Sequence, residues 1–350
     1  VDPNNPGQMI LDPNFNRQYS QFCYTFQYLP GKTTYLDTPV VPVAAFAGPG
    51  QFPLDCEYDN GTPVIYSAEG RTAGGDSFGG PYVGNQGDAT GVNLQHRVRI
   101  ISAGMVDVPN PAYDGTAATT PTIQRDYGFG TQGPGSSVTI DGVALPIESW
   151  SNDVIVVRVP GTTPAGGHQL HVQRANGKTT LSGVNLTVGG YGNAAAPPLT
   201  SPTRRVVQPG QTIQQMIDAA SPGDMILVPP GTYSELVIMN KKVQLRGWGA
   251  PSAVIQAAKF PAEKLQNWRD KVAALLAADT FDLLPGQAAT FDVPNNEPGL
   301  FNTEEAPGIL VVAPAANKTN GAQAFDNNRH AVIDGLTITG GDHGGGIFVN

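Results

Sequence analysis

Residues 211–235 read QTIQQMIDAASPGDMILVPPGTYSE, and this stretch decides the fold of the C-terminal part of the chain. Thr212 is a good helix N-cap, and Gln215 stands three residues later, where it completes a capping box. Apolar residues recur at the spacing of one helical face, namely Ile213, Met216, Ile217 and Ala220. The sequence therefore predicts a short amphipathic helix over 211–220, which the following Ser-Pro-Gly ends.

Short apolar runs follow this helix, each bounded by a tight turn. They fall at 225–228, 236–238, 243–247 and 253–255, and the pattern returns at 331–341 and 344–350. Strands of three or four residues separated by tight turns do not easily form hairpin sheets. They can stack as the coils of a solenoid, in which each coil buries its inner face against the next.

The string TIQQMIDAASPGDMILVPPGTYSE at 212–235 resembles the start of the pectin-lyase-like, right-handed parallel β-helix proteins. The resemblance implies that the first helix plugs the open end of the solenoid, where backbone groups and apolar side chains would otherwise be exposed. Residues 206–350 are thus expected to form the N-terminal cap and first coils. A helical insertion is expected at about 258–306. Its helix is expected over 261–278, with an apolar side formed by Leu265, Trp268, Val272, Leu275 and Leu276.

Residues 98–190 carry strands of four to seven residues at turn-marked intervals, as expected of a β-sandwich. The turn GFG at 128–130, the strand VTIDG at 138–142, and the stretches SWSNDVIVVRVP at 149–160 and AGGHQLHV at 165–172 resemble the IPT/TIG immunoglobulin-like domain. Such domains act as spacers or binding modules and do not carry catalysis. Residues 191–205 are predicted to be a linker.

Residues 1–97 are dense in Gly, Pro, Asn and Asp and show no helical periodicity, so an irregular β-rich region is expected there. The predicted fold class is therefore all-β and multi-domain. The whole chain has only 14% charged residues, with 43 glycines and 31 prolines, which suits a turn-rich β protein. Its net charge of −9 argues against nucleic acid as a partner, and no apolar run is long enough to span a membrane.

The two cysteines, Cys23 and Cys56, are predicted to form one disulfide, with two buried free thiols as the alternative. They do not have metal-site or redox-motif spacing. The chain begins at Val1 and shows no signal peptide, which fits a mature N-terminus after processing. The expected location is extracellular or on a cell surface, after signal-peptide removal.

No catalytic or cofactor-binding residue is predicted in this chain. Enzymes with the pectin-lyase-like fold carry their catalytic residues on central coils, and none of their motifs can be carried over to a position here. The weak metal candidates are Asp334, Asp342 and His343, of which Asp342 and His343 lie on a Gly-rich turn. The alternative is that Asp342 caps this turn, with His343 exposed beside it. Calcium remains an alternative because of the Asp- and Asn-rich loops.

The expected function is structural or adhesive, in an extracellular assembly or on a cell surface. The first alternative is a polysaccharide lyase or hydrolase whose catalytic coils lie beyond Asn350. The second is a non-catalytic carbohydrate-binding protein that uses Trp248 or Trp268 as a stacking platform. The alternative is that both rings are packed, Trp248 in a Gly-rich turn and Trp268 on the apolar face of the helix over 261–278. Because the sequence stops in mid-coil, either the protein continues or another chain covers this end. Other copies of the chain, another surface protein or a polysaccharide are the expected partners.

Overall fold

The structure is a computed structural model that describes residues 58–72, 74–84, 96–110, 112–113, 116–189, 202–257, 262–283, 306–312, 314, 331–341 and 345–350. It divides into two compact units. The described strands of the first unit are β4 (Met105–Pro109) and β5 (Thr122–Asp126), which form an antiparallel hairpin. The second unit holds the other described strands and both described helices.

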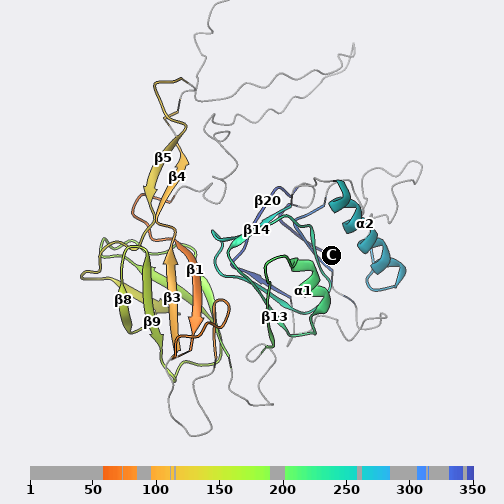
Figure 1. Ribbon diagram of the computed structural model, residues 1–350, viewed down its shortest axis with the longest axis horizontal. Coiled ribbons are helices and arrows are strands. Elements are labelled where there is room, and N and C mark those ends of the chain that lie inside the picture. Colours follow the sequence, from red (N-terminus) through yellow and green to blue (C-terminus); the bar gives the residue numbers. More distant parts are fainter. Residues whose placement is uncertain are drawn as a thin grey trace, which may run out of the picture. The chain divides into compact units, whose positions relative to one another are not determined.

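A β-sandwich forms the N-terminal part of the second unit (Figure 1). One sheet has the order β1 (Ile65–Arg71), β3 (His96–Ser102), β9 (Val154–Val159) and β8 (Ile147–Trp150). The other has the order β2 (Tyr82–Val83), β11 (Val184–Val188), β10 (Gly166–Gln173), β6 (Ser137–Ile140) and β7 (Val143–Ala144).

Alternation of side chains explains how the two sheets pack. Along β3 and β9 every second residue is buried, as a strand with one face on a core requires. The buried residues of both sheets form one apolar cluster, in which Val98 and Ile155 of the first sheet meet Leu170 and Leu186 of the second.

Two sandwich strands come from the region that the sequence assigned to residues 1–97. β1 pairs antiparallel with β3, and β2 pairs parallel with β11. The sandwich thus contains β1 and β2 in addition to strands of the region 98–190, where the sequence predicted it. Residues 1–57, including Cys23 and Cys56 and their predicted disulfide, lie outside the described residues.

Three purely parallel sheets follow the sandwich in the chain. The first consists of β12 (Arg204–Val206), β13 (Met225–Val228), β16 (Gln244–Gly247) and β19 (Val332–Asp334). The second consists of β14 (Gly231–Tyr233), β17 (Ala253–Gln256) and β20 (Thr337–Thr339). The third consists of β15 (Val237–Met239), β18 (Ile309–Val311) and β21 (Ile347–Val349).

The chain visits these sheets in rotation, so that β13, β14 and β15 are followed by β16, β17 and β18, and then by β19, β20 and β21. Strands that are neighbours in a sheet are therefore distant in sequence. Apolar side chains from all three sheets share one core, in which Ile226, Leu245, Ile255 and Ile309 are fully buried. This shared core explains why such short strands are stable together.

Helix α1 (Ile213–Ala219) covers this core, and in Figure 1 it lies across the area that the parallel strands surround. Its buried residues Ile213 and Ile217 belong to the same apolar cluster as the strands. The predicted capping box is present, because Thr212 Oγ1 accepts from Gln215 N and the Gln215 side chain accepts from Thr212 N.

Helix α2 (Ala262–Ala277) packs on the outer face of the third sheet. Trp268 and Val272 are buried against Ile238 of β15 and Leu310 of β18. The residues that precede them in β15 and β18, Val237 and Ile309, point to the other face of the sheet and belong to the core that the three sheets share. The third sheet is therefore covered on both faces, which explains its uninterrupted apolar sequence.

Within the second unit, the first parallel sheet contacts β2 and the loop that leads into it. Tyr82 packs with Met225 and Leu227 in a small apolar cluster. The Arg204 guanidinium lies 5.0 Å from the centre of the Phe78 ring and 4.6 Å from that of Tyr82, and its Nη1 donates to the Phe78 carbonyl at 3.0 Å. Cation–π contacts of this kind add to the apolar packing.

Candidate functional site

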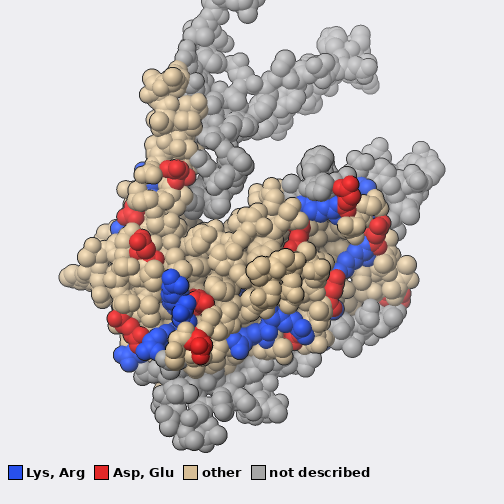
Figure 2. Space-filling model, viewed as in Figure 1, with Lys and Arg blue, Asp and Glu red and all other residues tan. Residues whose placement is uncertain are grey.

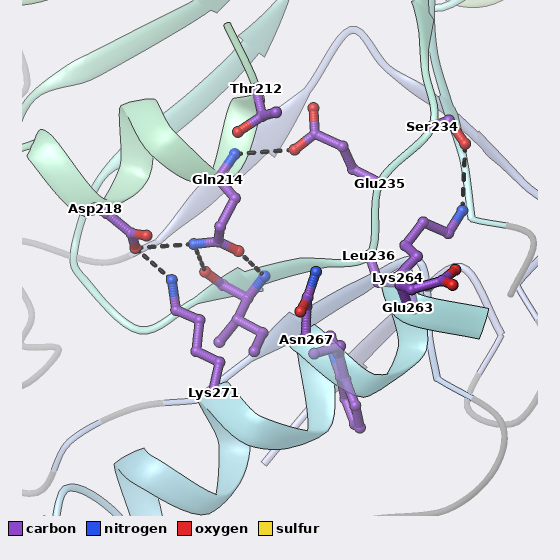
Figure 3. Close-up of a pocket in the computed structure, with 12 residues that line it drawn as sticks. Thr212, Gln214, Asp218, Ser234, Glu235, Leu236, Glu263, Lys264, Asn267 and Lys271 are labelled. Carbon is purple, nitrogen blue, oxygen red and sulfur yellow. Dashed lines mark hydrogen bonds and ion pairs between the residues drawn. The ribbon is translucent and has the colours of Figure 1, made fainter. Parts of the chain in front are cut away.

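A pocket of about 490 Å³ opens between α1, α2 and the segment that joins β14 to β15 (Figure 3). Gln214 and Asp218 reach it from α1, Ser234 and Glu235 from the joining segment, and Lys264, Asn267 and Lys271 from α2. Its residues therefore come from three stretches that are separated in sequence.

The carboxylate of Glu235 ties the joining segment to the start of α1. Its two oxygens accept from Ile213 N at 2.8 Å and from Gln214 N at 3.0 Å, so it satisfies two of the amides that a helix leaves free at its first turn. Burial raises the pKa of Glu235 above its usual value, and the two backbone hydrogen bonds and nearby Lys264 oppose this shift. Figure 3 shows this carboxylate facing Gln214.

Lys264 crosses from α2 to the joining segment. Its Nζ donates to the Gln256 carbonyl at 3.2 Å and lies 3.4 Å from Ser234 Oγ. Desolvation lowers the pKa of Lys264, while the negative charge of Glu235 acts in the opposite direction. The ammonium group is thus held at one side of the pocket by three neighbours.

Gln214 and Asp218 form the opposite wall on α1. The Gln214 amide pairs with the β15 backbone, since its Oε1 accepts from Ile238 N at 2.7 Å and its Nε2 donates to the Ile238 carbonyl at 3.1 Å. Gln214 Nε2 also donates to Asp218 Oδ1 at 3.0 Å, and Lys271 forms an ion pair with the same carboxylate. α1 is therefore fixed both to β15 and to α2.

Two side chains of α2 in this pocket have unused hydrogen-bonding capacity. Asn267 is exposed, and in Figure 3 its amide points into the pocket. Trp268 is only 4% exposed, and its Nε1 has no hydrogen-bond partner. The other polar lining residues supply carboxylates, amides, hydroxyls and ammonium groups, which can form hydrogen bonds and ion pairs.

Of the three predicted metal candidates, the structure describes Asp334. Asp334 pairs with Arg246, whose Nη1 lies 3.2 Å from Asp334 Oδ2. Burial lowers the pKa of Arg246, and the charge of Asp334 opposes this. Asp342 and His343 lie outside the described residues, and the described part of the chain contains no group of three or more metal-ligating side chains.

The two proposed tryptophan platforms are packed to different degrees. Trp268 belongs to the apolar cluster beneath α2, and Trp248 is half-buried. The carbonyl of Trp248 accepts from Ala68 N at 2.8 Å. Trp268 is only 4% exposed, so its ring offers no open face for stacking on a sugar.

Asp141, which directly follows β6, is joined to β10 by two polar contacts. His168 Nδ1 lies 2.7 Å from Asp141 Oδ2, and Asp141 Oδ1 accepts from Gln169 N at 2.8 Å. The backbone hydrogen bond from Gln169 and the contact with His168 lower the pKa of Asp141. His168 and His171 lie on opposite faces of β10, as their spacing predicts, so they do not form a joint site.

Charged side chains are sparse on the face seen in Figure 2. Basic and acidic groups alternate over α2, and no extended basic area is visible on that face. Neither of the two described helices is both long and apolar enough to cross a membrane.

Residues 127–188 match the IPT/TIG domain family. The match covers β6 to β11, which contribute to both sheets of the sandwich, so the immunoglobulin-like assignment is confirmed for this segment. No curated protein matches the chain. The pocket between α1 and α2 lies outside the matched residues.

The sequence did not reveal this pocket. Thr212 and Trp268 were singled out for capping and packing, but nothing in the sequence joins Glu235 to the α1 amides or Lys271 to Asp218, 53 residues away. A possible signal was the pair of lysines, Lys264 and Lys271, on a helix whose apolar side was already assigned to packing.

Proposed function

We propose that this chain is a structural or adhesive part of a protein that acts outside the cell or on its surface. In this proposal an IPT/TIG sandwich leads into a right-handed parallel β-helix of the pectin-lyase-like kind, capped by α1. The observation that carries it is the rotation of the chain through three parallel sheets directly after an IPT/TIG segment. Both modules serve other proteins as rigid spacers or binding surfaces.

The parallel registers support the β-helix proposal. Leu245 stands opposite Ile226 on one side and Ile333 on the other, and Ile255 stands opposite Tyr233 and Ile338. Like side chains thus stack along each sheet, which is how a solenoid builds a continuous core. The capping box on α1 and its burial over that core fit the role of an end cap.

The location is tested by labelling intact source cells with a membrane-impermeant amine reagent. Partly exposed lysines of the chain, such as Lys178, should be modified before the cells are lysed. A cytoplasmic protein should serve as the negative control. Modification only after lysis, together with absence of the protein from the culture medium, would contradict the proposed location.

The enzymatic alternative places catalytic coils beyond residue 350. It is tested by incubating the protein isolated from its source with acidic and neutral polysaccharides and measuring new chain ends. We expect no turnover by the source protein. Turnover would replace the structural proposal with the enzymatic one.

Other copies of the chain or another surface protein are the proposed partners. The parallel sheets pair through backbone hydrogen bonds, and pairing of this kind can also join separate chains. Light scattering over a range of concentrations tests self-association. A monodisperse monomer at the highest concentration would contradict that part of the proposal.

A further inference from the structure

We propose that the pocket between α1 and α2 binds a neutral, hydroxyl-rich ligand of the size of one or two sugar rings. Its volume of about 490 Å³ lies in the range of roughly 300–1,000 Å³ that small-molecule sites occupy. All the residues that line the pocket belong to the parallel-sheet region. Ligand binding there can therefore be tested independently of the proposed extracellular location.

The charges in the pocket favour a neutral ligand over an acidic one. Its lining holds the carboxylates of Asp218, Glu235 and Glu263 but only the ammonium groups of Lys264 and Lys271. Lys271 is already paired with Asp218, and Lys264 is held by Ser234 Oγ and the Gln256 carbonyl. An acidic sugar would have to break these contacts and would face excess negative charge.

The unused polar groups suit hydroxyl groups. The Asn267 amide offers both a donor and an acceptor, which match neighbouring hydroxyls on a ring. Each Glu235 oxygen accepts one backbone N–H and retains a second lone pair for a ligand hydroxyl. Asn267 reaches the pocket from α2, and Glu235 reaches it from the segment that joins β14 to β15 (Figure 3).

The indole of Trp268 lines the apolar side of the pocket. A buried N–H without an acceptor is rare in native proteins and calls for an explanation. Trp268 lines the pocket, is 4% exposed, and leaves Nε1 unsatisfied. Leu236 and Ile238 provide apolar contacts for the ring carbons of a sugar.

The test uses the full chain and saturation-transfer NMR, with titration calorimetry for affinities. The neutral probes are cellobiose, maltose and lactose, the acidic probe is digalacturonate, and the cationic probe is spermidine. We expect at least one neutral disaccharide to bind, and Asn267→Ala to weaken it about 5–10-fold, as loss of one or two neutral hydrogen bonds implies. Gln266→Ala, one residue away on α2 and outside the pocket, is the matched control and should bind as the wild type does.

Both substitutions are at exposed positions, and circular dichroism confirms that the variants fold. Binding of a neutral probe that Asn267→Ala weakens and Gln266→Ala preserves supports the proposal. Three outcomes would overturn it: no binding by any neutral probe, tighter binding of digalacturonate or spermidine, or equal binding by the Asn267 variant and the wild type.

Discussion

Replacement of Gly247 by alanine should separate two neighbouring layers of the parallel sheets. Gly247 ends β16, and a Cβ atom at this position would lie 1.9 Å from the carbonyl oxygen of Gly335, which directly follows β19. Real Cβ atoms essentially never approach other atoms closer than 3.0 Å. Because the obstacle is backbone and not a flexible side chain, β16 and β19 must move apart by about 1 Å, against a normal strand spacing of about 4.8 Å.

The cost follows from this displacement. Overpacking costs about 1–3 kcal/mol, and the weakened hydrogen bonds between β16 and β19 add about 1 kcal/mol. We therefore expect Gly247→Ala to lower the stability of this layer by about 2–4 kcal/mol. The matched control is Gly345→Ala, since Gly345 has φ +68° but an added Cβ would meet nothing within 4 Å. Its cost should be only the roughly 1–2 kcal/mol of a left-handed alanine.

Native-state hydrogen exchange measures the effect where it arises, at the amides of β16 and β19. The Gly247 variant should lose protection at Leu245 and Ile333, while β9 of the sandwich keeps its protection. The Gly345 variant should leave Leu245 and Ile333 close to the wild type. If Gly247→Ala cost no more than Gly345→Ala, the close approach of the two layers would be refuted.

Three further variants test the capping box of α1, the pocket residue Glu235 and the contact of Asp141 with β10. Thr212→Ala removes the capping box of α1 and should cost about 1 kcal/mol in denaturant unfolding, whereas Thr212→Ser should restore it. The raised pKa of Glu235 means that the folded state binds its proton more tightly than the unfolded state. Wild-type stability should therefore fall as pH rises above the usual Glu value of 4.5, and Glu235→Gln should flatten this slope in a pH series of thermal melts. Asp141 has a lowered pKa, so its contribution is present above 3.8 and is lost as pH falls further. Asp141→Asn should cost less than about 1 kcal/mol at neutral pH because the side chain is half-exposed, and an undiminished cost in acid would contradict the role of its charge.

Local structure could be predicted from the sequence where the spacing of apolar residues agrees with the capping and turn residues at the ends of an element. The helix predicted at 211–220 is α1 at Ile213–Ala219, and the predicted strand at 225–228 is β13. The helix predicted at 261–278 is α2, and its expected apolar side is the side that packs in the cluster of Trp268 and Val272. Capping residues, helical spacing and flanking Pro-Gly turns determine these elements locally.

Pairing between distant segments could not be predicted in the same way. Gln244 stands opposite Val332, 88 residues later, and no local pattern specifies that register. β1 and β2 join the sandwich through tertiary pairing, although their surroundings in sequence are rich in Gly and Pro. The pocket depends on the same long-range geometry, since Glu235 and Lys264 meet only after α2 has packed on the third sheet.

A crystal structure of the chain would test the layered arrangement of the parallel sheets. We expect β16 to pair in parallel with both β13 and β19, with Leu245 between Ile226 and Ile333. We also expect the chain to turn right-handedly through the three sheets, with α1 over the core. Antiparallel pairing of β16, or a different set of neighbours for Leu245, would contradict the layered arrangement on which the proposed function rests.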